Sequence, residues 1–188
     1  MGFPKAFMPL GNTTLIETVI SRLQPIFRRV LVVARNSKEL RDLNTVILTD
    51  HRLEKGPLVG LARGLSVSDA PWCFVAGCDM PFLRPEVIQR MAAHLNDGDV
   101  LVPNVAGHLQ PLHAFYSQRC CAVAKRQLDH GITSIQSIFS SCDVSHLEAD
   151  TFLDIDPELL SFRDVDTTDD YHEAQKLVQG RDHLEVRP

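Results

Sequence analysis

Residues 72–83 read WCFVAGCDMPFL, an apolar run that closes on an aspartate and a proline. A short apolar run of this kind, bounded by turn residues, is typical of a β-strand that is covered on both faces. The pattern predicts a buried strand over residues 72–78, with Asp79 at its carboxyl end. Pro81 restricts the backbone just beyond that aspartate, so its side chain is expected to be held in a fixed position.

Similar apolar runs lie on both sides of this stretch, and helical patterns separate them. Runs that predict strands cover residues 30–34, 45–48, 99–103 and 112–116. Apolar residues at helical spacing cover 15–23, 56–65, 84–95, 117–128 and 167–178. Thr14 and Glu17 form a capping-box pattern at the start of the first helix.

Strands that alternate with helices predict an α/β protein. Because parallel strands need crossover connections that cover the sheet, we expect a single-domain, Rossmann-like, mostly parallel sheet with helices on both faces. The predicted nucleotidyltransferase-like domain covers residues 1–180, and residues 181–188 form a polar C-terminal tail.

Composition and charge argue against several classes of protein. The chain has 44% apolar residues and a formal net charge of -5, so it lacks the positive charge of a typical nucleic-acid-binding protein. It contains no apolar run near the roughly 20 residues of a membrane-spanning helix, and no signal-peptide pattern. We therefore expect a cytoplasmic protein without a membrane or nucleic-acid partner. Its five cysteines form no CxxC pair, which argues against a zinc site of that spacing.

The carboxyl ends of the predicted strands are the places where chemistry is expected, because open α/β sheets bind ligands there. A carboxylate held rigidly at this edge, as predicted for Asp79, suits Mg²⁺, which takes one or two protein carboxylates together with substrate phosphates. The alternative is that Asp79 only caps the following turn. Asp50 follows the strand at 45–48 and lies on the same predicted edge; its alternative role is that of a turn residue.

Other candidate positions lie near the two ends of the chain and in its middle. Asp164 and Asp166 are two residues apart on a predicted strand, so they share a face, and Asp166 is a second candidate ligand for the metal. Lys5 lies in a short loop from which its ammonium group can reach phosphate oxygens; the alternative is a solvated surface lysine. His113, in the stretch HLQPLHAFY, is expected either to line a second pocket or to lie exposed in a loop.

Six fragments of the sequence form a characteristic ordered set. They are MGFPKAFMPLGNTTLIETVISRL at 1–23, TDH at 49–51, GPLVGL at 56–61, CDMPFL at 78–83, QPLHAFY at 110–116 and FRDVDTTDDY at 162–171. In this order and approximate spacing they resemble the molybdenum cofactor guanylyltransferases, the MobA-type branch of the nucleotidyltransferase-like α/β family. The resemblance covers nearly the whole chain.

The resemblance implies an activity and a set of site residues. The implied reaction transfers GMP from GTP to Mo-molybdopterin, releases pyrophosphate and forms the molybdopterin guanine dinucleotide cofactor. Mg²⁺ is the implied cofactor, held by Asp79, with Lys5 and Asp79 as the catalytic residues. The implied nucleotide site consists of Lys5, Asn36, Asp50 and Asp79. Transient contact with molybdoenzymes or their chaperones is also expected.

Two alternative functions stay open at this point. One is a cytidylyltransferase, or a nucleotidyltransferase that acts on another phosphorylated acceptor. The other is a non-catalytic partner that binds the pterin or a molybdoenzyme chaperone.

The start of the sequence departs from the family pattern. Family members begin with a central strand and a glycine-rich loop whose backbone N–H groups wrap the triphosphate, and this sequence enters at the last Met-Gly of that loop. We therefore expect a fold without the first strand, through a start assigned at an internal methionine; a shortened protein is the alternative. The family's N-x-N-T-P motif also reads DVDTT here, at residues 164–168. Carboxylates in place of amides either add metal affinity or repel the triphosphate.

Overall fold

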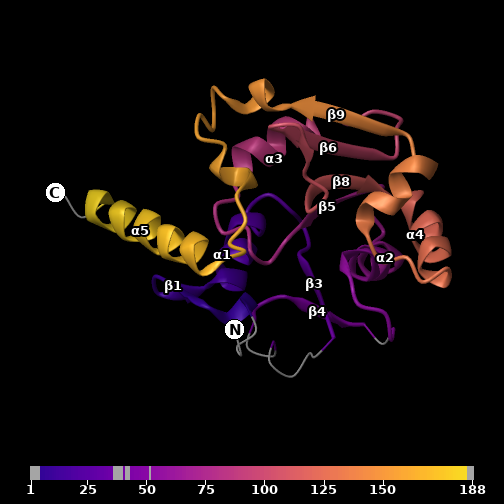
Figure 1. The fold of residues 1–188 in the computed structure, drawn as a ribbon, viewed down its shortest axis with the longest axis horizontal. Helices are drawn as coiled ribbons and strands as arrows, with labels where there is room; N and C mark the ends of the chain where they lie inside the picture. Colours follow the sequence, from indigo (N-terminus) through magenta and orange to yellow (C-terminus); the bar gives the residue numbers. More distant parts are fainter. Residues whose placement is uncertain (1–4, 36–39, 41–42, 51, 186–188) are drawn as a thin grey trace.

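Two sheets and a small hairpin form the centre of the fold (Figure 1). The computed structural model describes residues 5–35, 40, 43–50 and 52–185. The larger sheet contains β5, β8, β6 and β7 in that order, with β9 also paired to β6, while β3–β4 is a separate pair and β1–β2 the hairpin. The strands are β1 (Pro9–Leu10), β2 (Thr13–Thr14), β3 (Leu31–Ala34), β4 (Val46–Thr49), β5 (Trp72–Ala76), β6 (Val100–Val105), β7 (His108–Leu109), β8 (His113–Ser117) and β9 (Val144–Glu148).

The larger sheet is mixed, so the predicted mostly parallel sheet is wrong. Only β6 and β9 run parallel in it, whereas β5–β8, β6–β8 and β6–β7 are antiparallel. The connections explain the difference, because two residues separate β6 from β7 and three separate β7 from β8. A parallel crossover needs about a dozen residues or more, so the chain has to turn straight back. In the smaller sheet β3 and β4 are parallel.

Helices cover both faces of the larger sheet, as the sequence predicts (Figure 1). On one face α2 and α4 pack against Val100 and Val102, and on the other α1 and α3 pack against Leu101. This division follows from the alternation of side chains along a strand. The helices are α1 (Leu15–Leu23), α2 (Pro57–Val67), α3 (Pro85–Ala92), α4 (Cys120–Asp129) and α5 (Thr168–Glu185), with the 3-10 helices η1 (Lys5–Phe7), η3 (Ile135–Ser141), η4 (Ala149–Phe152) and η5 (Leu160–Phe162).

The start of α1 confirms the predicted capping box. The backbone N–H of Thr14 donates to Glu17 Oε2 at 2.8 Å, and the backbone N–H of Glu17 donates to Thr14 Oγ1 at 3.4 Å. The buried stripe of α1 is also the predicted one, and it consists of Leu15, Ile16, Val19, Ile20 and Leu23. Local sequence therefore determines where this helix begins and which face it buries.

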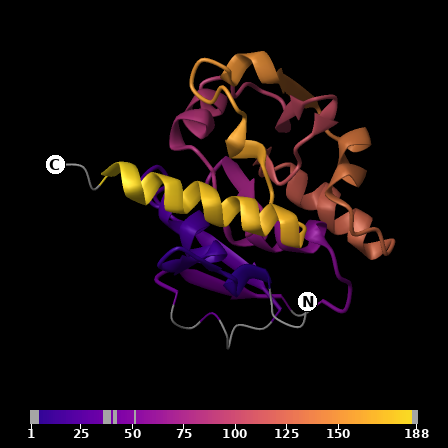
Figure 2. The same ribbon diagram turned by 60° about the vertical axis from the view of Figure 1, so that its left-hand side comes forward.

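Helix α5 projects away from the rest of the molecule (Figures 1 and 2). Its first half packs against the β1–β2 hairpin, because Tyr171, Ala174 and Val178 contact the cluster that contains Leu10. The Tyr171 hydroxyl also donates to the carbonyl of Pro9. Neither α5 nor any other helix in the described residues is both long and apolar enough to cross a membrane.

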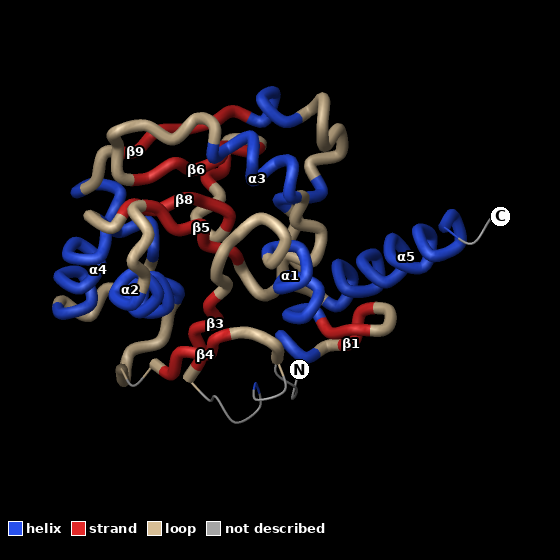
Figure 3. Tube along the Cα trace, turned by 180° about the vertical axis from the view of Figure 1, so that it is seen from behind, coloured by secondary structure: helices blue, strands red, loops and turns tan. Residues whose placement is uncertain are grey.

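The strands β3 and β5 lie next to each other without pairing (Figure 3). Within the described residues, β3 pairs only with β4, and β5 only with β8. An apolar cavity of about 420 Å³ separates them, and we call it the interstrand slot. Its lining comes from β3, β5, α1 and α2, and includes Ile16, Val19, Ile20, Leu23, Leu31–Val33, Gly60, Leu61, Gly64, Leu65 and Trp72–Ala76.

Candidate active site

Asp79 lies in the turn that follows β5, as predicted for a residue at a strand end. A Cβ atom at Gly77 would lie 2.4 Å from Asp79 Oδ1, so the missing side chain at position 77 leaves the space that this carboxylate fills. The backbone on both sides is fixed by hydrogen bonds. Gly77 N–H donates to Leu112 O at 3.1 Å, and Val165 N–H donates to Asp79 O at 2.9 Å. The turn therefore presents the carboxylate in a defined position.

Lys5 links Asp79 to the C-terminal part of the chain. Its Nζ donates to Asp79 Oδ2 at 2.9 Å and to Asp166 Oδ1 at 2.6 Å. The side chains of Lys5 and Asp79 are 30% and 23% exposed, and that of Asp166 is 64% exposed. The ammonium group therefore bridges two carboxylates in a place that a ligand can reach from solvent.

The site carries more negative than positive charge. Burial raises the pKa of Asp164, and the neighbouring carboxylates of Asp166 and Asp79 raise it further. Burial alone would lower the pKa of Lys5, but its hydrogen bonds to Asp166 and Asp79 outweigh this effect, and its pKa is raised. Lys5 is therefore firmly protonated at neutral pH, and three carboxyl groups share its single positive charge.

A buried network ties the two acidic segments together. Asp156 is fully buried, and its Oδ2 accepts the backbone N–H of Ser161 at 2.8 Å. Its Oδ1 lies 3.3 Å from Arg84 Nε, and Ser161 Oγ accepts the backbone N–H of Arg84 at 3.0 Å. Arg84 follows Asp79 in the chain, and Ser161 precedes Asp164. This Asp156 network, consisting of Arg84, Asp156 and Ser161, therefore positions both acidic segments; the sequence did not predict it.

The structure brings together Lys5, Asp79 and Asp166, three of the residues that the sequence singles out. The strand predicted around Asp164 and Asp166 is wrong, because the segment 163–166 forms none. The backbone N–H of Val165 bonds to Asp79 O instead of to a neighbouring strand. The segment thus reaches the site as a loop fastened to the turn after β5.

The two other predicted nucleotide residues lie elsewhere. Asp50 directly follows β4, and its Oδ1 accepts the backbone N–H of Arg52 at 3.0 Å, as in the turn role considered for it. No hydrogen bond or ion pair found in the described part of the chain joins Asp50 to Lys5 or Asp79. Asn36 lies outside the described residues.

The carboxylates of Asp79 and Asp166 fit a Mg²⁺ ion that is shared with phosphate groups. One oxygen of each already converges on a single cation, the ammonium of Lys5. Mg²⁺ usually keeps several waters and binds through one or two carboxylates plus substrate phosphates. Within residues 5–35, 40, 43–50 and 52–185, no group of three or more His, Cys, Asp or Glu side chains is placed to hold a metal. A metal at Asp79 and Asp166 would therefore depend on oxygens from a substrate.

His113 is fully buried, so the exposed-loop interpretation of this residue is wrong. It begins β8, and its ring packs between Phe74, with ring centroids 5.1 Å apart, and Phe162, at 4.5 Å. Burial lowers the pKa of His113 to about 3, and the backbone of Ser161 opposes this only in part. The imidazole is therefore neutral in the folded protein at neutral pH.

We expect His113 to make the protein sensitive to mild acid. Below about pH 6.5 the unfolded chain binds this proton, whereas the folded chain binds it only near pH 3, so stability falls as the pH drops through this window. The loss between neutral pH and about pH 5 is about 2 kcal/mol. Thermal melts of His113→Leu should lose this part of the pH dependence, while His130→Leu, at an exposed histidine, should keep it. Equal slopes in the two variants would contradict this assignment.

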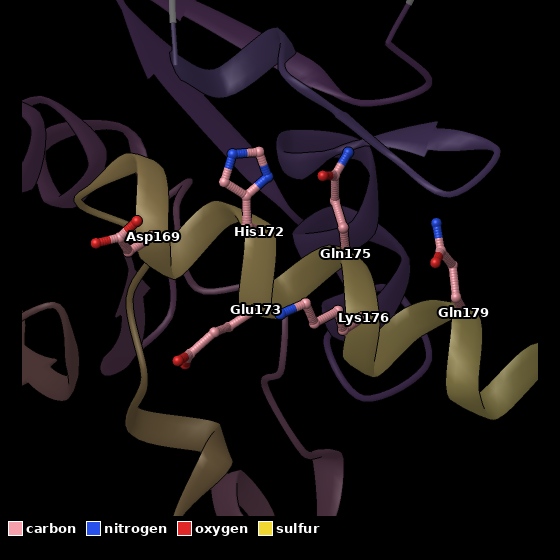
Figure 4. Close-up of a pocket in the computed structure, with 6 residues that line it drawn as sticks. All are labelled: Asp169, His172, Glu173, Gln175, Lys176 and Gln179. Atoms are coloured by element: carbon pink, nitrogen blue, oxygen red, sulfur yellow. The ribbon is translucent and has the colours of Figure 1, made fainter.

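The outer face of α5 is polar but is not a site. Its lining residues are Asp169, His172, Glu173, Gln175, Lys176 and Gln179, and Figure 4 shows that all of them come from this one helix. A ligand there would be contacted from one side only, unlike the concave surfaces that enclose most small ligands.

Sequence comparison identifies relatives over nearly the whole chain. The MobA-like NTP transferase domain matches residues 1–149. The molybdenum cofactor guanylyltransferase of Desulfosudis oleivorans is 30% identical over 180 residues, which cover 95% of this chain and 89% of that protein. A probable molybdenum cofactor guanylyltransferase of Natranaerobius thermophilus is 28% identical over 184 residues, which cover 95% of this chain and 90% of that protein.

Solved structures share the fold. The molybdopterin-guanine dinucleotide biosynthesis protein A of Archaeoglobus fulgidus is 25% identical and reaches a TM-score of 0.84, with 95% of this chain and 92% of that chain covered. The 2-C-methyl-D-erythritol 4-phosphate cytidylyltransferase of Thermus thermophilus is 18% identical with a TM-score of 0.65, and 94% of both chains is covered. Since the domain match spans more than half of the sequence, the chain belongs to the MobA-like NTP transferases, a family of α/β nucleotidyltransferases.

Proposed function

We propose that this protein transfers GMP from GTP to Mo-molybdopterin, which forms the molybdopterin guanine dinucleotide cofactor and releases pyrophosphate. The observation that carries the proposal is the convergence of Lys5, Asp79 and Asp166 just beyond β5. Strand ends of this kind are where open α/β sheets bind ligands. The names of the relatives support guanine as the base and the pterin as the acceptor.

The proposed reaction needs little proton transfer from the protein. A terminal phosphate oxygen of molybdopterin attacks the α-phosphorus of GTP, and the bond from that phosphorus to the bridging oxygen of the β-phosphate breaks. Pyrophosphate leaves with the bonding electrons. The attacking phosphate is already largely ionised at neutral pH, so no side chain has to deprotonate it. Catalysis then depends on positioning and on neutralising phosphate charge.

The residues of the site suit this task. Asp79 and Asp166 would hold the Mg²⁺, which neutralises charge on the α-phosphate and on the departing pyrophosphate. Once these carboxylates hold the metal, the ammonium of Lys5 is free to donate to a phosphate oxygen. We assign Asp50 and Asn36 to the nucleotide site on the strength of the family resemblance.

The direct test is a transfer assay with Mo-molybdopterin, Mg²⁺ and GTP that carries a label on its α-phosphate. Chromatography should detect a labelled pterin dinucleotide, and the same assay with labelled CTP should give none. A product from CTP alone would instead assign a cytidylyltransferase. A folded protein that binds the pterin but gives no product with either nucleotide would favour the non-catalytic alternative.

Gly77→Ala should weaken nucleotide binding without unfolding the protein. The new Cβ would fill the space of Asp79 Oδ1, and the aspartate can turn away by rotation about χ1. Loss of its hydrogen bond to Lys5 should weaken the affinity for Mg²⁺-GTP about tenfold, the scale of one charge-assisted hydrogen bond. Isothermal titration calorimetry measures the affinity. Gly60→Ala is the matched control, because a Cβ there meets nothing within 4 Å; equal affinities in both variants would argue against the positioning role of Gly77.

A further inference from the structure

The interstrand slot between β3 and β5 has features that a simple packing defect would not combine. It lies between the edges of two sheets, and helices close it on two sides (Figure 3). Each of these boundaries says something about what would fill the slot, and together they select one kind of occupant.

The strand edges are the first evidence. Within the described residues, the edge of β3 away from β4 and the edge of β5 away from β8 have no strand partner. All four residues of β3 and all five of β5 are only half-buried, although both strands are apolar, whereas all five residues of β8 are buried. Unpaired N–H and C=O groups on two facing edges form a template for another strand. A small apolar ligand would fill the volume but would leave these backbone groups without partners.

The walls of the slot are the second evidence. Ile16, Val19 and Ile20 of α1 line one side, and Leu61 and Leu65 of α2 line the other. These residues offer no charge or hydrogen-bonding side chain, so the occupant has to be apolar on both of its faces.

Two glycines of α2 are the third evidence. Gly60 and Gly64 are one helical turn apart and both line the slot. A Cβ at Gly60 would meet nothing within 4 Å, and one at Gly64 would meet only Val33 Cγ2, at 3.9 Å. Glycine weakens the interior of a helix relative to alanine. Placed where the wall has open space, these residues leave room for a backbone to approach α2 closely.

We propose that the interstrand slot is a docking site for one extended, uncharged β-strand of four or five residues, the lengths of β3 and β5. The strand pairs with β3 on one side and with β5 on the other, which joins the two sheets into one. Its side chains are apolar on both faces and small on the face toward α2. This mode of binding is strand addition, in which main-chain hydrogen bonds give the affinity and side-chain pockets the selectivity.

The test uses the full chain and a synthetic peptide with a fluorescent label. The peptide RVLVVAR copies residues 29–35, a strand that this fold already accommodates in a parallel pair. Fluorescence anisotropy should show saturable binding, and hydrogen exchange should show new protection of residues 31–34 and 72–76. The control peptide carries proline in place of the residue that corresponds to Val32, which removes one N–H donor. It should bind at least about tenfold more weakly, as expected for a lost main-chain pairing.

Variants of the protein locate the binding. Gly60→Leu fills the slot from the α2 side and should weaken peptide binding about tenfold or more. Ser66→Leu adds the same side chain at an exposed position of α2 and should leave the affinity unchanged. Circular dichroism confirms that both variants keep their helix content.

Three results would overturn the proposal. Equal binding of the proline peptide would show that backbone pairing is not involved, and protection of only one edge would show that the strand does not bridge the two sheets. A dimer in sedimentation velocity that protects both edges without peptide would assign the slot to a second copy of this chain. None of these readouts uses GTP or the pterin, so they do not depend on the proposed function.

Discussion

Asp79→Asn is expected to lower the rate of GMP transfer by about 10²- to 10³-fold, the range found when one preorganised electrostatic group is removed from an active site. Asparagine keeps the size of the side chain and an oxygen that can accept from Lys5, but it removes the negative charge. That charge is one of the two that converge on the Lys5 cation. The rate should therefore fall because Mg²⁺ and the phosphates lose their fixed counter-charge, while the fold stays intact.

The measurement compares steady-state rates at increasing Mg²⁺ concentration. If Asp79 holds the metal, the Mg²⁺ concentration for half-maximal rate should rise in Asp79→Asn. Asp166→Asn should show a smaller effect in the same direction, because its carboxylate is 64% exposed and more hydrated. Asp69→Asn serves as the matched control, since Asp69 pairs only with Arg28 on the surface, at 3.5 Å. An Asp79→Asn rate equal to that of the control would remove Asp79 from its assigned role.

Local sequence was sufficient for those elements whose boundaries depend on neighbouring residues. Thr14 and Glu17 predict the start of α1, and Pro85 predicts the first turn of α3. The direction of a strand within the sheet is different, because it depends on how long each connection is and where it leads. The turn at residues 106–107 and the short return to β8 were not recognised in the sequence, so the mixed sheet was predicted as parallel.

The site was predictable only in part, for a related reason. A strand-end pattern predicts Asp79, but Lys5 gains its role from contacts with residues 74 and 161 positions away. Family resemblance supplied that role, because no local pattern distinguishes Lys5 from a solvated lysine. The Asp156 network had no such support. Its hydrogen bond between Arg84 and Ser161 spans 77 positions, and neither residue belongs to a motif that predicts burial of a carboxylate.

Asp156→Ala is expected to destabilise the protein by about 2–4 kcal/mol, because it breaks a buried ion pair and leaves the backbone N–H of Ser161 without an acceptor. For a chain of this size the melting temperature should fall by about 5–15 °C. Differential scanning calorimetry measures both quantities. Asp154→Ala is the matched control, since the exposed Asp154 pairs with Arg90 at 2.9 Å on the surface. Such a pair contributes about 0.5 kcal/mol or less.

The same substitution should also impair the site, because the Asp156 network lies between the two acidic segments. Without it, the loop that carries Asp164 and Asp166 is held mainly by the bond from Val165 to Asp79. We expect the affinity for Mg²⁺-GTP to fall in Asp156→Ala even at a temperature at which the variant is fully folded, and to stay unchanged in Asp154→Ala. Unaltered affinity in a folded but less stable Asp156→Ala protein would show that the network supports the fold alone. Reduced affinity would make Asp156 a positioning residue that acts through the loop bearing Asp166.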